Sequence, residues 1–326
     1  MKHLCISVKD IVQGVGFRPF IYNLAKSLNL KGYVKNTSDG VIIEAEGEYL
    51  SEFVKAIQSK SPALARIDKI ETGEFPLRGY EDFVIIDSID DGRFTLVSPD
   101  ISICDDCLKE LLDPSDRRYL YPFINCTNCG PRYSITKRVP YDRPNTTMSA
   151  FKMCPQCLSE YSNPHNRRFH AQPNACSECG PSLELRVKSS EFRVNNEKNP
   201  IEAVIELLKQ GDIVAIKGLG GFHLCCDALN ADAVKRLREK KRRSNKPFAL
   251  MSPNVETIRQ FCEVSEDEEK LLTDRRRPIV LLKKKSEVKS ERSGKLSNEI
   301  APNNKYLGFM LPYTPLHYLI FYYPLT

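Results

Sequence analysis

Four C-x-x-C pairs constrain the fold of this 326-residue chain more than any other feature. Eight of its twelve cysteines form these pairs: Cys104, Cys107, Cys126, Cys129, Cys154, Cys157, Cys176 and Cys179. The last four repeat the first four after a shift of fifty residues, and the same shift takes Gly130-Pro131 to Gly180-Pro181. The segment is therefore an internal duplication of one small unit.

Two thiolates three positions apart on a tight turn bind one tetrahedral ion, and two such pairs complete a shell of four sulfurs. We therefore expect two structural zinc ions that are closed to substrate. The spacing allows each ion to take both pairs of its own copy or the copies to interleave. Disulfides are the alternative. We disfavour disulfides, because Met1 runs straight into a strand-like segment and we expect no secretory leader. The expected location is the cytoplasm, where thiols stay reduced.

Length and composition predict a multidomain protein without a membrane span. A chain of 326 residues is long enough for two or three domains, and 41% hydrophobic with 28% charged residues is ordinary for a globular protein. No apolar run reaches the length of a bilayer. The positive charge is concentrated: eight Lys and Arg stand against one Glu between Lys235 and Lys246.

Residues 1–90 follow a β-α-β-β-α-β pattern, which predicts a ferredoxin-like domain. A helix is expected from Phe17, because Phe17, Ile21, Leu24 and Leu28 fall on one face of a 3.6-residue period. A Ser38-Asp39-Gly40 turn predicts a hairpin. A second helix is expected over 49–60, and strands over 67–74 and 83–87.

The loop before the first helix is a candidate phosphate cradle. It consists of Gly14, Val15, Gly16, Phe17 and Arg18. The glycines permit unusual backbone angles, the helix contributes the positive end of its dipole, and Arg18 contributes a guanidinium. The alternative is that Arg18 is a surface ion-pair partner and Asn36 a turn residue.

The sequences VQGVGFRPF and GYVKNTSDGVIIEAEG closely resemble the acylphosphatase family. The resemblance implies that Arg18 holds the phosphoryl group and that Asn36 orients the attacking water. This division of labour suits an activated substrate, because an acyl phosphate requires charge neutralisation and a placed nucleophile.

Residues 91–188 hold the duplicated module, and residues 199–326 form a third domain. Helices are expected over 200–210 and 231–243, strands over 212–217 and 247–251, and a glycine-rich turn over 217–224. A lysine at a glycine turn and a dense basic patch favour a phosphate-bearing ligand. The turn is not a Walker A loop, since the Gly-Lys-Ser/Thr end is missing.

The stretches KGLGGFHLCCDA, LREKKRRSNKPFALM and LGFMLPYTPLH resemble the YrdC/Sua5-type domain of the HypF family, the carbamoyltransferases of [NiFe]-hydrogenase maturation. The order of the three units is also that family's order. The resemblance implies that the first domain hydrolyses carbamoyl phosphate, and that the YrdC-like domain joins carbamate to ATP as carbamoyl adenylate. In that family a further C-terminal domain, which is not visible in this chain, passes the carbamoyl group to the C-terminal cysteine of a partner, HypE.

On this resemblance, four residues contact the ATP phosphates or the acyl adenylate: Lys217, Lys241, Arg243 and Lys246. The alternative for each is a solvated surface charge. Because the chain ends at Thr326, we expect an incomplete YrdC-like domain with an exposed apolar tail over 316–325. Acyl phosphate hydrolysis should then be retained and transfer lost. A free-standing acylphosphatase and a zinc-stabilised RNA-binding protein are the competing interpretations.

Overall fold

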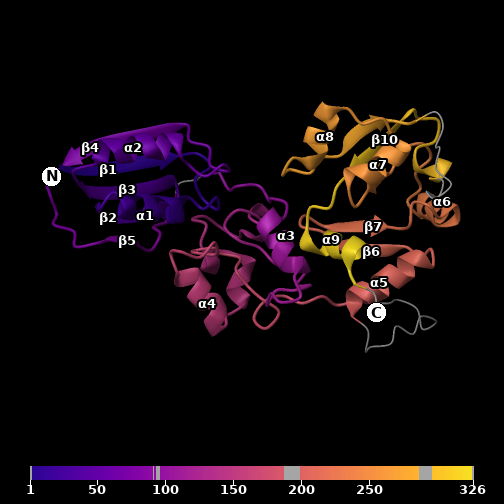
Figure 1. Ribbon diagram of the computed structural model, residues 1–326, viewed down its shortest axis with the longest axis horizontal. Helices are drawn as coiled ribbons and strands as arrows, with labels where there is room; N and C mark the ends of the chain where they lie inside the picture. Colours follow the sequence, from indigo (N-terminus) through magenta and orange to yellow (C-terminus); the bar gives the residue numbers. More distant parts are fainter. Residues whose placement is uncertain (1, 91, 93–95, 187–198, 286–295, 325–326) are drawn as a thin grey trace. The chain divides into compact units, whose positions relative to one another are not determined.

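The computed structural model describes residues 2–90, 92, 96–186, 199–285 and 296–324 (Figure 1). It forms two compact units, one made of residues 1–101 and 124–181 and the other of residues 102–123 and 182–326. The predicted boundary between the second and third domains falls in residues 187–198, outside the described part. Within the described residues, no helix combines the length and apolarity that a membrane crossing requires.

The N-terminal part of the first unit is a five-stranded sheet with the order β4-β1-β3-β2-β5. All neighbouring strands are antiparallel except β2 and β5, which are parallel. The strands are β1 (Lys2–Lys9), β2 (Lys31–Thr37), β3 (Gly40–Gly47), β4 (Lys69–Phe75) and β5 (Phe83–Ile85). The predicted ferredoxin-like arrangement is confirmed, and β5 adds a fifth strand at one edge.

Two helices pack on this sheet and close its core (Figure 1). Helix α1 (Phe17–Ser27) begins at the predicted residue and buries Phe17, Ile21 and Ala25. Helix α2 (Leu50–Ser59) buries its own apolar stripe in the same cluster. Both helices share one core, and the loop before α1 lies at the same end of the sheet as the end of β2.

The duplicated module consists mainly of turns around two short helices. Helix α3 (Asp105–Leu112) and helix α4 (Pro155–Ser162) each begin immediately after the first cysteine of their copy. Three 3₁₀ helices lie between the copies: η1 (Tyr133–Ile135), η2 (Arg143–Asn145) and η3 (Thr147–Ala150). The equivalent helices show that the duplication extends to backbone structure.

The rest of the second unit alternates helices with short strands. Strands β8 (Ala249–Met251), β10 (Tyr306–Met310) and β9 (Val280–Lys283) form a sheet in that order, with β8 parallel and β9 antiparallel to β10. Strands β6 (Val214–Lys217) and β7 (Phe222–Cys225) form a separate hairpin. The helices are α5 (Pro200–Lys209), α6 (Ala231–Lys240), α7 (Val255–Phe261), α8 (Glu266–Thr273), η4 (Asn298–Ile300) and α9 (Pro315–Tyr322).

Three local predictions for this unit need correction. The glycine-rich turn spans only Gly218 to Gly221, because residues 222–225 pair with β6 as β7. The basic helix ends at Lys240 rather than at residue 243, since the chain turns at Arg242 with a φ of 50°. The apolar tail is not wholly exposed: α9 buries three consecutive residues from His317 to Leu319 and exposes Phe321 and Tyr322. Leu325 lies outside the described residues.

Candidate functional site

The predicted phosphate cradle is an open backbone loop that leads into α1. Gly14 and Gly16 have φ angles of 71° and 76°, in the left-handed region that glycine tolerates best. Within the described part of the chain, no group accepts a hydrogen bond from the backbone N–H of Gly14, Val15 or Gly16. These donors, together with the N-terminus of α1, make the loop suited to an anion.

Arg18 lies in the first turn of α1, where its guanidinium is largely buried. Its Nη2 forms an ion pair with Asp142 Oδ1 at 2.6 Å and donates to the Tyr141 carbonyl at 3.2 Å. Nη1 lies 3.4 Å from Ser88 Oγ. A guanidinium fixed by several neighbours has little freedom left to lose when a phosphoryl group binds it.

The structure brings Asn36 and Arg18 together. Asn36 stands near the end of β2 and is buried. In the amide orientation that satisfies both groups, Asn36 Oδ1 accepts from Arg18 Nε and Nη2, both at 3.2 Å. The two predicted catalytic side chains therefore form one hydrogen-bonded pair rather than two separate surface features.

Residues of the cysteine-rich module close this site from the other side. The two sides line a partly open cavity of about 30 Å³. This volume is room for about two water-sized groups. The module's contribution to the lining is Thr127, Arg132, Tyr141, His170, Ala171, Gln172 and Pro173.

Gln13 and Arg132 form hydrogen bonds that connect the loop before α1 to the cysteine-rich module. The buried Gln13 donates to the carbonyls of Thr37 and Gly40 and accepts from the Tyr141 backbone N–H at 2.8 Å. Arg132 Nε donates to the Gly14 carbonyl, and its two Nη atoms donate to four further carbonyls at 2.8–3.0 Å. Those four carbonyls belong to Cys126, Thr127, Cys129 and Pro131. Arg132 thus joins the cradle to a cysteine turn.

Replacing Arg132 with lysine should loosen the cradle, because the three N–H donors of an ammonium cannot replace the hydrogen bonds that the guanidinium donates to five carbonyls. We expect kcat/KM for an acyl phosphate to fall roughly 10- to 100-fold, since small misplacements of a binding group cost that much. Steady-state kinetics and thermal melting would measure it, with the exposed Arg138→Ala on the same segment as the control. Unchanged kinetic constants in a destabilised protein would contradict this positioning role.

The sequence did not indicate most of the residues that the cysteine-rich module contributes to the cavity lining. Tyr141, Asp142 and Gln172 are far from the cradle in sequence and belong to no motif singled out above. His170 also belongs to no such motif, since the equivalent position of the first copy carries a leucine, Leu120. Long-range packing brought these residues to the site, so no local sequence signal could have identified them.

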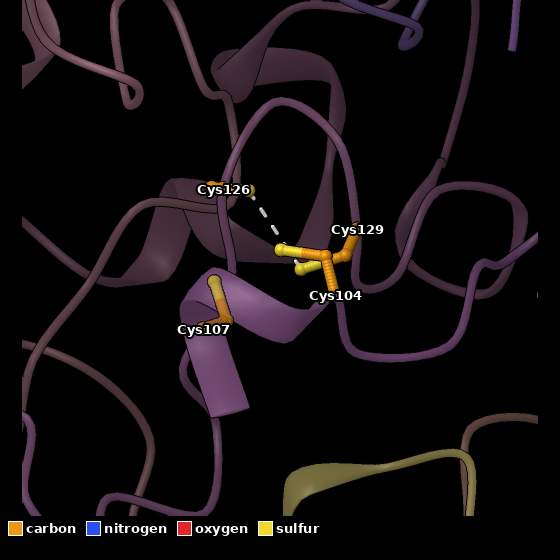
Figure 2. Close-up of side chains that lie close together, drawn as sticks. All are labelled: Cys104, Cys107, Cys126 and Cys129. Carbon is orange, nitrogen blue, oxygen red and sulfur yellow. Dashed lines mark hydrogen bonds between the residues drawn. The ribbon is translucent and has the colours of Figure 1, made fainter. Parts of the chain in front are cut away.

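The cysteines form two clusters, each composed of the two pairs of one copy. In Figure 2, the side chains of Cys104, Cys107, Cys126 and Cys129 turn toward one another, and their sulfurs lie within 4.8 Å of each other. The same holds for Cys154, Cys157, Cys176 and Cys179. The question that the spacing left open is thereby decided: the copies do not interleave.

The sulfur geometry fits tetrahedral zinc. Zn–S bonds of about 2.3 Å in a tetrahedron place neighbouring sulfurs about 3.8 Å apart. The Cys126–Cys129 and Cys154–Cys176 sulfurs are 3.8 Å apart, and those of Cys176 and Cys179 are 3.7 Å apart. Burial opposes ionisation of Cys154, but hydrogen bonds from Cys157 and the other thiols lower its pKa to about 7. The two clusters can therefore hold metal ions.

The four predicted nucleotide contacts stand around two turns of the second unit. Lys217 ends β6, with its Nζ 5.0 Å from the centre of the Phe222 ring. Lys241 and Lys246 are exposed after α6, and Arg243 packs 5.7 Å from the Phe248 ring. Lys217 is also exposed and adjoins the glycine turn, and exposed ammonium groups are accessible to phosphates.

Arg238 organises the basic turn, although sequence reasoning did not single it out. Its side chain is buried and donates to the carbonyls of Arg243, Ser244 and Lys246 at 3.2–3.3 Å. It also donates to the carbonyls of Glu299 and Ile300. The strongly basic run therefore contains one buried arginine with a structural role and several exposed lysine and arginine side chains.

The fold defines a multidomain protein with an acylphosphatase-like domain and a duplicated four-cysteine module. Residues 5–85 match the acylphosphatase family, residues 103–136 and 153–186 match the HypF finger, and residues 206–326 match the Sua5/YciO/YrdC family described as telomere recombination.

Three relatives agree with this assignment. Carbamoyltransferase HypF2 of Cupriavidus necator is 51% identical over 324 residues, which are 97% of this chain and 39% of that protein. An acylphosphatase of Thermotoga maritima is 48% identical over 88 residues, 26% of this chain and 97% of the relative. A crystal structure of full-length HypF in the phosphate- and nucleotide-bound form has 51% identity and a TM-score of 0.92, covering 98% of this chain and 41% of that one.

The chain belongs to the HypF carbamoyltransferase family. It spans about two-fifths of the length of the carbamoyltransferases it matches. The predicted combination of acylphosphatase-like, duplicated finger and YrdC-like folds is confirmed.

Proposed function

We propose that the cavity around Arg18 and Asn36 hydrolyses carbamoyl phosphate to carbamate and phosphate. The observation that carries the proposal is the convergence of a guanidinium, a carboxamide and a row of unengaged backbone N–H groups on one small cavity. Arg18 and the loop would neutralise the phosphoryl oxygens, and the Asn36 amide would hold the attacking water. Water then attacks phosphorus, the P–O bond breaks, and the carbamate oxygen takes the electron pair.

We further propose that the second unit uses the carbamate. ATP would bind near Lys217, Lys241, Arg243 and Lys246, whose positive charges suit a departing pyrophosphate. The product would be carbamoyl adenylate. The nucleotide-bound form of the related HypF structure supports this assignment. Transfer to the C-terminal cysteine of a HypE-type partner, for cyanide-ligand synthesis, would require the parts of the family's proteins that this chain does not match.

The competing function is hydrolysis of acyl phosphates in general, which the similarity to an acylphosphatase over residues 5–85 favours. The similarity to HypF carbamoyltransferases over nearly the whole chain favours the carbamoyl compound instead. A generic acylphosphatase would turn over benzoyl phosphate as readily as carbamoyl phosphate.

A two-part assay tests the proposal on the chain as it stands. Phosphate release from carbamoyl phosphate is measured against a protein-free blank and against benzoyl phosphate, and pyrophosphate release is measured after ATP is added. We expect hydrolysis well above the blank, a strong preference for the carbamoyl compound, and pyrophosphate only when both substrates are present. Hydrolysis at the blank rate would refute the first activity, and pyrophosphate release without carbamoyl phosphate would refute the second.

A further inference from the structure

His170 lies in the wall of the cavity that holds Arg18 and Asn36. It comes from the second copy of the cysteine module, and no step proposed above uses it. Its imidazole is therefore a titratable group at the site without an assigned role.

The local fold does not require a histidine at this position. His170 adopts a φ of 53°, and its counterpart fifty residues earlier, Leu120, adopts a φ of 54°. The two backbone N–H groups make equivalent hydrogen bonds of 2.9 Å, to Tyr161 and Leu111 respectively. Leucine thus satisfies the same turn in the first copy, so the imidazole itself calls for another explanation.

His170 lines the cavity, and two aromatic side chains support its ring. It packs against Tyr161 and Phe169, with ring centres 5.0 Å and 4.7 Å away. Gln172 Nε2 donates to the His170 carbonyl at 2.7 Å and fixes the backbone. Among the residues that the structure describes, none forms a hydrogen bond with either ring nitrogen.

The environment keeps this imidazole neutral. Burial lowers the pKa of His170 to about 4, and the charge of Arg18 acts in the same direction, while Asp142 opposes the shift. A neutral imidazole carries one donor and one acceptor nitrogen, whereas the protonated ring has no acceptor. An acceptor nitrogen therefore remains available at neutral pH.

We propose that His170 determines substrate specificity by accepting a hydrogen bond from the amino group of carbamoyl phosphate. This inference rests on the function proposed above. Acetyl phosphate is the informative comparison, because it has nearly the same shape but carries a methyl group where the carbamoyl compound has NH₂. A site built to bond an N–H group discriminates against an analogue that lacks it, since the buried acceptor is then left unpaired.

The test compares kcat/KM for carbamoyl and acetyl phosphate in the wild-type chain and in His170→Leu, the residue that the first copy carries in the same conformation. We expect the wild type to prefer carbamoyl phosphate by roughly 10-fold or more, the range that one unpaired buried polar group produces. In His170→Leu the preference should largely disappear, because kcat/KM should fall much more for carbamoyl phosphate than for acetyl phosphate.

Two further variants sharpen the result. His170→Asn keeps an acceptor and tolerates a positive φ, so it should retain part of the preference. His165→Leu changes an exposed histidine in the same module and should leave the preference intact. Melting curves and zinc content would verify that each variant is folded.

The inference and the proposed function can fail separately. If the wild-type chain does not hydrolyse carbamoyl phosphate above the blank, the proposed function is wrong. Suppose instead that the wild-type chain hydrolyses carbamoyl phosphate and that His170→Leu leaves the ratio of kcat/KM for the two substrates unchanged, for example by lowering both values in parallel. The proposed function then stands, and the specificity role of His170 is overturned.

Discussion

Arg18→Ala should lower kcat for carbamoyl phosphate hydrolysis by on the order of 10²–10³, the loss that follows removal of one charge-stabilising donor from a preorganised site. The guanidinium already lies beside the backbone cradle and in contact with Asn36. Without it, the charge on the phosphoryl oxygens would face only N–H dipoles. Phosphate release measured at saturating substrate would give the change directly.

Removal of Arg18 also leaves the partly buried Asp142 carboxylate without its ion-pair partner. A loss of activity could therefore come from instability, and Arg18→Lys separates the two causes. Lysine keeps the charge near Asp142 but lacks the planar fork, so we expect near-normal melting with activity still strongly reduced. Lys55→Ala removes an exposed charge from α2 and serves as the control. Wild-type turnover in Arg18→Ala would remove this residue from the proposed mechanism.

Loss of metal from the second cysteine cluster should have the largest effect on stability. Zinc binding in comparable units contributes on the order of 10 kcal/mol to folding. That equals the whole stability of an ordinary domain, about 5–15 kcal/mol. Cys157→Ser removes a fully buried ligand, and we expect the bound zinc to fall from two ions to one per chain and residues 153–181 to unfold.

Metal analysis, thermal melting and limited proteolysis of this segment would measure the loss. Cys5→Ser is the matched control, because Cys5 lies on β1 in the same unit and outside both clusters. Because residues 170–173 line the cavity, unfolding should also remove its outer wall. A Cys157→Ser protein with full zinc content and an unchanged melting curve would exclude this cluster as a metal site.

The local features of the fold could be read from short stretches of sequence. The apolar period predicted α1 from its first residue, and the Ser38-Asp39-Gly40 turn predicted the β2–β3 hairpin. Predictions of element ends were less accurate: the basic helix stops early at Lys240, and β7 begins inside the predicted turn. Those ends depend on strand pairing and on long-range contacts, such as the hydrogen bonds from Arg238 to the carbonyls of Glu299 and Ile300.

The residues whose chemistry is local could be identified from the amino-acid sequence: the repeated thiol pairs, the glycine loop and the arginine that follows it. Three-dimensional packing established which pairs form one cluster, that Arg132 joins the loop to a cysteine turn, and that His170 lines the cavity. The difference arises from distance along the chain. Spacing and periodicity report neighbours within a turn or a strand, whereas Arg18 and His170 lie 152 positions apart and meet only because the module packs against the sheet domain.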